Sequence, residues 1–207
     1  MRILVGCGCA SAIAASFNTP IAGVIFAMEV VMLEYSISTF TPIILSSVVG
    51  AAMTRAVYGH DEAFSVPTLQ ISTLLELPYI LFSGVIFGCL AAAFIWLSRL
   101  TYRHTHNITV SLRFTLVGAA GGVIAFMTPE VMGVGYDTVN AALVGQISLT
   151  TLLLITFTKL VATSLFAGAG IPGGLIGPSI FMGATAGAAM GYNGGETIPD
   201  RNESANF

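Results

Sequence analysis

The groups of this chain best suited to chemistry are backbone amides rather than side chains. The stretch GAGIPGGLIGPSIFMGA, residues 168–184, lies inside Leu160 to Gly195, a run without Asp, Glu, Lys or Arg. An apolar run of that length predicts a membrane-buried helix. Pro172, Pro178 and several glycines interrupt it, so the helix is expected to break inside the bilayer.

A break at this depth predicts a binding site for an anion. In hydrocarbon, irregular backbone persists only where protein or a water-filled cavity surrounds it. Pro178 suits an early helical position, and Ser179–Met190 is unbroken, so we predict a new helix beginning near Leu175. Its first N–H groups have no intrahelical acceptor and together carry about half a positive charge. Glycines allow an anion to approach such amides closely.

A second break is predicted at FNTP, residues 17–20, where Asn18 and Pro20 separate two short apolar helices. The first runs from Ile3 to about Phe17, and the second from Ile21 to about Leu33. Proline-interrupted half-helices of this kind indicate the binding region of a transporter. Two internal helix starts are what an anion pathway needs.

Two ionisable side chains are candidates for the same pathway. An intramembrane carboxylate is a functional candidate by default, which singles out Glu29; the alternative, a carboxylate near the cytoplasmic end of its helix, remains open. Lys159 is the only charged residue between Thr138 and Gly195. It either snorkels to the membrane surface or adds positive potential to the pathway, and we favour snorkelling.

The elements that position these residues are membrane helices. Of the 207 residues, 55% are hydrophobic and 8% charged, whereas soluble domains contain about 25% charged residues. A spanning helix needs about 20 apolar residues. Five charge-free runs reach that length: Ile3–Met28, Tyr35–Thr54, Leu77–Ser98, Thr138–Thr158 and Leu160–Gly195. The fold class predicted is therefore an all-α, multi-pass integral membrane protein with broken and half-spanning helices.

Charge and cysteine content exclude several other classes. The net charge of −3 gives no reason to expect nucleic acid as a partner. Cys7, Cys9 and Cys89 form no disulfide framework and no metal motif, and neither a cofactor nor an enzymatic activity is expected. Arg99, Arg103 and Arg113 make the loop 99–113 cytoplasmic by the positive-inside rule and place the acidic loop 59–76 outside. We expect the inner or plasma membrane of the cell.

Two other interpretations concern the glycines. Gly168, Gly170 and Gly173 match the G-x-G-x-x-G pattern of dinucleotide sites, but that pattern requires a preceding strand, and an apolar helix is predicted there. A kinked packing helix without a ligand stays open. Glycines four apart predict packing seams between helices; they are Gly84/Gly88, Gly118/Gly122 and Gly183/Gly187/Gly191.

Two segments resemble the CLC family of chloride channels and chloride/proton exchangers. ASFNTPIAGVIFAMEVVM (15–32) is similar to the family's AAFNAPLAGxLFxxEE, and GAGIPGGLIGPSIFMGATAG (168–187) to its GxPGGxFxPxLxxGAxxG. The resemblance implies two inverted halves, a homodimer in the lipid bilayer, and chloride as the transported ion. It also implies that Gly174, Leu175, Ile176, Gly177 and Pro178 form the filter segment, with the amides of Leu175 and Ile176 binding the anion.

The departures from the family pattern set the expected mode of transport. Ile176 replaces the filter phenylalanine. Glu29 matches the first residue of the acidic pair, while Val30 replaces the second, which is the proton relay of the exchangers. Val30 therefore favours channel-like conduction; an exchanger, or a truncated non-conducting fragment, is the alternative. We expect residues 1–192 to be a partial membrane domain, the end of one half and the start of the other, and 193–207 a polar tail.

Overall fold

The computed structural model describes residues 1–33, 35–59 and 76–192, and these are helical, as predicted. The polar tail 193–207 and most of the acidic loop 59–76 lie outside the described residues. The chain divides into two compact units, Met1–Ser65 and Val66–Phe207. Each unit is described by itself.

The described residues of the first unit form four helical segments: α1 (Arg2–Phe17), α2 (Pro20–Phe26), the π-helix η1 (Ala27–Met32) and α3 (Ile37–Tyr58). The break predicted at Asn18 and Pro20 is confirmed. Asn18 adopts the left-handed conformation (φ 54°), and Pro20 begins α2. Proline is well placed there because the first helical N–H has no intrahelical acceptor in any case.

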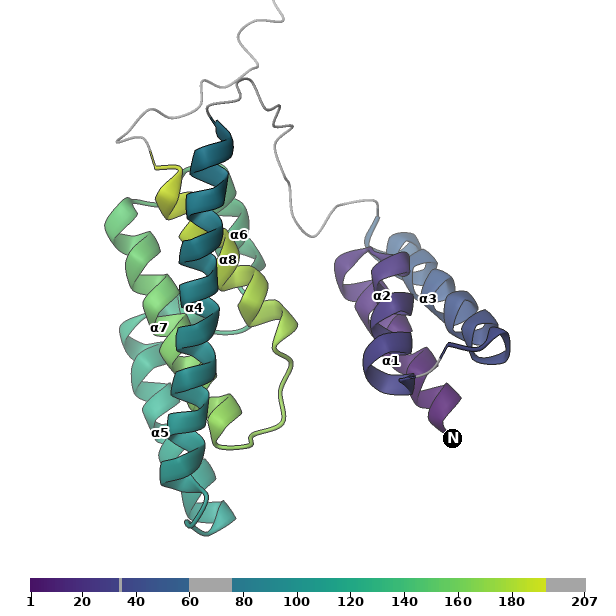
Figure 1. Ribbon diagram of the computed structural model, residues 1–207, viewed down its shortest axis with the longest axis horizontal. Coiled ribbons are helices and arrows are strands. Elements are labelled where there is room, and N and C mark those ends of the chain that lie inside the picture. The colour runs from purple at the N-terminus through teal and green to yellow at the C-terminus, as the bar shows by residue number, and fades with distance from the viewer. Residues whose placement is uncertain (34, 60–75, 193–207) are drawn as a thin grey trace, which may run out of the picture. The chain divides into compact units, whose positions relative to one another are not determined.

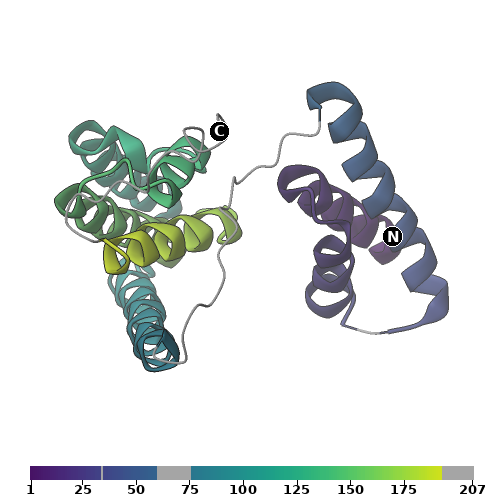
Figure 2. The ribbon, with the colours of Figure 1, turned by 90° about the horizontal axis from the view of Figure 1, so that it is seen from above.

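Close backbone contacts hold α1 and α2 against α3 (Figures 1 and 2). An added Cβ at Gly23 would lie 2.5 Å from the carbonyl oxygen of Ala10, and one at Gly50 would overlap Ser11. The hydroxyl of Ser47 donates to the carbonyl of Pro20 at 2.6 Å. This contact from α3 reaches the first residue of α2, so the break is fixed by tertiary packing.

The second unit contains α4 (Glu76–Thr105), α5 (Val110–Met127), the 3₁₀ turn η2 (Pro129–Val131), α6 (Tyr136–Leu143), α7 (Leu149–Gly168) and α8 (Ile176–Met190). The long helix α7 contacts α4, α5 and α8, as Figure 1 shows. Two glycines make these contacts close: an added Cβ at Gly121 would lie 2.5 Å from the Phe166 ring, and one at Gly168 would overlap the backbone of Ser98.

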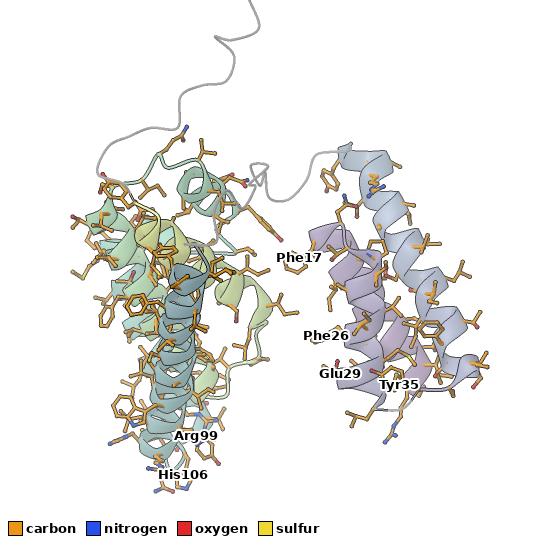
Figure 3. All side chains as sticks on the ribbon, turned by 45° about the horizontal axis from the view of Figure 1, so that its top comes forward. Phe17, Phe26, Glu29, Tyr35, Arg99 and His106 are labelled. Atoms are coloured by element: carbon orange, nitrogen blue, oxygen red, sulfur yellow. The ribbon has the colours of Figure 1, made fainter. Side chains whose placement is uncertain are left out.

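The basic segment around residue 100 is more helical than the sequence indicated. We treated residues 99–113 as a loop, but α4 extends to Thr105 and α5 begins at Val110. Figure 3 shows Arg99 and His106 at the same end of α4. The basic side chains therefore lie on helix ends rather than along an extended loop.

Length and composition identify four candidate spans among the described residues: Ile37–Tyr58, Leu77–Thr105, Val110–Met127 and Leu149–Gly168. Three apolar helices are shorter: Arg2–Phe17, Pro20–Met32 and Ile176–Met190. This confirms a multi-pass membrane protein with half-length helices. The charge-free runs do not correspond one to one with spans, because turns divide three of them and α5 contains Arg113.

Most of the glycines of the predicted seams make no interhelical contact within their own unit. An added Cβ at Gly84, Gly88, Gly118, Gly122 or Gly183 would meet none of the described atoms within 4 Å. Of that set, Gly187 makes the interhelical contact, 3.7 Å from Phe87. The spacing of glycines places them on one helix face, but it does not determine whether another helix covers that face.

Candidate functional site

The segment between α7 and α8 forms the internal helix start that the sequence predicted. α7 ends at Gly168, and Gly170 has a φ of +73°, a conformation that favours glycine. Leu175 precedes the first residue of α8, Ile176, and Pro178 lies in the first turn. The prediction of a helix beginning near Leu175 is confirmed.

The first turn of α8 presents backbone amides. Its earliest intrahelical hydrogen bond runs from the Ser179 amide to the Leu175 carbonyl at 3.0 Å. The amides of Ile176 and Gly177 precede that bond and have no intrahelical acceptor, and in the described part of the chain no side chain caps this end. Leu175 is 45% exposed and Ile176 36% exposed. The positive end of the helix dipole is therefore accessible.

A cavity of about 640 Å³ borders this helix start. Three of the five predicted filter residues line it, Gly174, Leu175 and Pro178, whereas Ile176 and Gly177 follow in the adjoining backbone. Pro172, the predicted helix-breaking residue, and Lys159 line the same cavity. The structure thus brings most of the second unit's candidate residues to one place.

Lys159 does not snorkel, and the expectation that it would is wrong. The side chain is 3% exposed. Its Nζ donates hydrogen bonds to the carbonyl oxygens of Val131 at 2.7 Å and Gly133 at 2.8 Å, and it lies 4.7 Å from the centre of the Phe181 ring. Among the described residues no carboxylate pairs with it. These contacts satisfy the ammonium inside the protein, so it has no need to reach the membrane surface.

Glu29 and Val30 lie in the first unit, on the π-helix η1. Both side chains are exposed within that unit, Val30 by 54%. Figure 3 shows Glu29 toward the end of the unit opposite Phe17. Its place near the end of a helix fits the structural alternative as well as a role in transport.

Two contacts of the candidate residues were not foreseen from sequence. Arg55 donates from Nε to Oδ1 of Asn18 at 2.8 Å, and the segment Val131–Gly135 contacts Lys159 and α8. The signal for the second was present in the sequence: Gly133 and Gly135 flank Val134, and both have positive φ. Alternating glycines of this kind indicate a tight turn.

The nucleotide interpretation of Gly168, Gly170 and Gly173 is wrong. The helix α7 precedes the motif where a strand would be needed. In the described part of the chain, His, Cys, Asp and Glu form no cluster suited to a metal ion, and the three cysteines are free thiols.

The four candidate spans, the half-length helices and the break between α7 and α8 define a multi-pass helical membrane protein. Residues 1–206 match the model of the voltage-gated chloride channel family, and the chain belongs to this CLC family. It is therefore related to channels and transporters and not to an enzyme family.

Three relatives show the range of the family. The chain is 27% identical to the voltage-gated ClC-type chloride channel ClcB of Citrobacter koseri, over 99% of this chain and 50% of the relative. It is 31% identical to the chloride channel protein CLC-f of Arabidopsis thaliana (94% and 27%), and 26% identical to the H⁺/Cl⁻ exchange transporter ClcA of Vibrio parahaemolyticus (95% and 44%). The chain thus spans about half the length of its bacterial relatives.

Proposed function

We propose that this chain forms part of a chloride pathway and binds the anion at the first turn of α8. The observation that carries the proposal is the uncapped helix start at Leu175 and Ile176, which borders a cavity of about 640 Å³. Backbone amides and the helix dipole favour an anion there. The names of the relatives, which include chloride channels and a chloride exchanger, support chloride as that anion.

The cavity also has the electrostatic character that an anion pathway requires. Lys159 contributes a buried positive charge to its wall, and in a medium of low dielectric such a charge acts over a longer range than in water. Because its hydrogen bonds go to the carbonyls of Val131 and Gly133, this charge attracts the anion without ligating it tightly. That combination favours entry and permits release.

For the mode of transport, we propose channel-like conduction with weak or no proton coupling. This proposal rests on Val30, whose side chain cannot take up a proton. The neighbouring Glu29 has a side chain that can. Related proteins include both a ClcB channel and a ClcA exchanger, so family membership leaves this choice open. We further propose that the intact protein is a homodimer, as the family resemblance implies.

The binding site is tested by titrating ¹⁵N-labelled protein with chloride in detergent micelles. The Leu175 and Ile176 amide signals should shift and saturate. Ile176→Pro removes one of these amides and should abolish the saturation; because Leu175 lies in the α region (φ −96°, ψ −14°), which proline disfavours for the residue before it, the variant also changes the Leu175 backbone. Leu149→Pro, at the first position of α7, is the control for a proline at another helix start and should leave the saturation unchanged. Equal loss in both variants, or no saturable shift in the unmodified protein, would contradict the site.

The mode is tested by chloride efflux from liposomes, with the external pH recorded at the same time. Chloride efflux without proton movement supports the channel proposal. Efflux with a fixed ratio of protons to chloride identifies an exchanger. Efflux equal to that of empty liposomes would show that this chain does not conduct and would restrict the proposal to binding.

A further inference from the structure

The segment Val131–Gly135 connects Lys159 of α7 with the first turn of α8. This segment follows α5 and precedes α6. On one side, the ammonium of Lys159 donates to the carbonyls of Val131 and Gly133. Hydrogen bonds from a charged donor are about twice as strong as those between neutral groups, so Lys159 fixes the backbone of this segment firmly.

On the other side, the same segment touches α8 at two points. An added Cβ at Gly177 would lie 3.1 Å from Cγ1 of Val134, so the Val134 side chain rests against the first turn of the helix. An added Cβ at Gly135 would lie 2.5 Å from the Phe181 ring, so the backbone at Gly135 lies directly on that ring. Phe181 in turn is fully buried and faces the ammonium of Lys159.

We propose that Lys159 is a positioning residue for the anion site: through Val131–Gly135 it fixes the first turn of α8 at the edge of the cavity. The proposal rests on the proposed function, because it gives Lys159 a defined part in that site. Lys159 does not ligate the anion here, since two of its three N–H groups bind carbonyls and the Phe181 ring lies beside the ammonium. Beside the attraction of its charge, Lys159 acts on the geometry of the anion site through Val134 and Gly177.

The central experiment compares amide hydrogen exchange in chloride-free buffer for the unmodified protein and three variants. In Lys159→Met, the Met132 amide of the segment and the Ser179 amide of α8 should both exchange at least about tenfold faster, since each local opening costs less free energy. Lys159→Arg, which keeps the charge and donors, should stay within about twofold of the unmodified protein. Because no chloride is present, this result does not depend on the proposed function.

The third variant, Val134→Ala, guards against a protein that fails to fold when the ammonium is lost. Val134 is 42% exposed, so its truncation leaves the core intact. It should speed exchange at Ser179 while leaving Met132 unchanged, because the Lys159 hydrogen bonds remain. Faster exchange at Met132 without any change at Ser179 in Lys159→Met would overturn the proposal, as would an unaffected Ser179 in Val134→Ala.

Chloride titration then separates positioning from direct binding. Lys159 is the only lysine of the sequence, so ¹³C-lysine labelling gives one side-chain Cε signal. If Lys159 positions the site, this signal moves little at saturating chloride, while Lys159→Met and Val134→Ala each weaken chloride binding, by about tenfold for the former. A large shift of the Cε signal, with Val134→Ala binding chloride normally, would identify Lys159 as a direct ligand instead. Lack of chloride binding by the unmodified protein would contradict the proposed function and leave the exchange result to decide the positioning role.

Discussion

Arg55 donates a hydrogen bond of 2.8 Å from its Nε to Oδ1 of Asn18, the residue directly after α1. Asn18 has a φ of 54°, and asparagine is one of the few non-glycine residues that adopt this conformation readily. Its side chain therefore serves two purposes, the local turn and a contact with the last turn of α3. The break between α1 and α2 is held from a distant part of the chain.

We expect Arg55→Met to lower the free energy of unfolding by about 1 kcal/mol, the usual net value of one hydrogen bond. The contact is exposed within the first unit, so a much larger loss is not expected. Thermal unfolding in detergent measures the effect. Arg2→Met, which removes an exposed arginine from the start of α1, is the control and should be neutral. Equal effects in the two variants would mean that the hydrogen bond contributes nothing.

The second prediction concerns the contact between α1 and α2. Gly23→Ala should lower the free energy of unfolding by about 1–3 kcal/mol, because its Cβ would lie 2.5 Å from the backbone oxygen of Ala10 and the helices would have to separate. Gly84→Ala serves as the matched control: a Cβ there meets no described atom within 4 Å. It should leave the stability unchanged or raise it slightly, since alanine favours helix more than glycine does. Denaturant titration of both variants would decide; a neutral Gly23→Ala contradicts the close packing of α1 and α2.

A third prediction separates backbone strain from steric overlap in the segment that contacts α8. Gly135 and Gly145 have the same φ, +76°, but a Cβ at Gly135 would overlap Phe181, whereas a Cβ at Gly145 would meet no described atom. Gly145→Ala should therefore cost only the strain of the left-handed conformation, about 1–2 kcal/mol. Gly135→Ala should cost about 1–3 kcal/mol more, the usual range for overpacking.

Thermal unfolding of Gly135→Ala and Gly145→Ala measures this difference. Chloride titration adds a second comparison, because only Gly135→Ala should displace the segment that rests on the first turn of α8. If the two variants have the same stability and bind chloride equally well, the contact between Gly135 and Phe181 contributes nothing to either.

The features that the sequence predicted are those with local causes. Pro20 and Pro178 end or begin helices because proline lacks an N–H and has a fixed φ. The breaks at 17–20 and 168–178 therefore follow from the residue types at those positions, as does the all-helical class from the apolar runs. The start of α8 was placed correctly for the same reason.

The features that the sequence missed depend on contacts between distant residues. The acceptors of Lys159 lie 28 and 26 residues before it in the chain, and nothing in the spacing of residues indicates that their carbonyls point toward α7. Without those acceptors, snorkelling was the reasonable expectation for a lone lysine. Glycine contacts within the units also depend on tertiary packing: Gly23 and Gly121 are in close contact while Gly84 and Gly118 are not, although all four lie in helices.

The last prediction uses substitutions at Val30 to test the mode of transport. This side chain is 54% exposed within its unit and follows Glu29 directly on the π-helix η1. Replacing it by glutamate provides an ionisable group where the exchangers have theirs, according to the family resemblance. In liposomes, Val30→Glu should therefore increase the number of protons moved per chloride ion. Val30→Leu, which keeps the position apolar, should leave that number unchanged.

Glu29→Gln completes this test, because Glu29 is the neighbouring carboxylate already present in the chain. If Glu29 participates in transport, Glu29→Gln should alter the rate of chloride efflux or its proton coupling in the unmodified background. If Glu29 is only a carboxylate near a helix end, as its position on η1 allows, both quantities should stay unchanged. Proton coupling that is already high in the unmodified protein and is unaffected by Val30→Glu would overturn the channel-like mode, because protons would then cross by a route that needs no glutamate at this position.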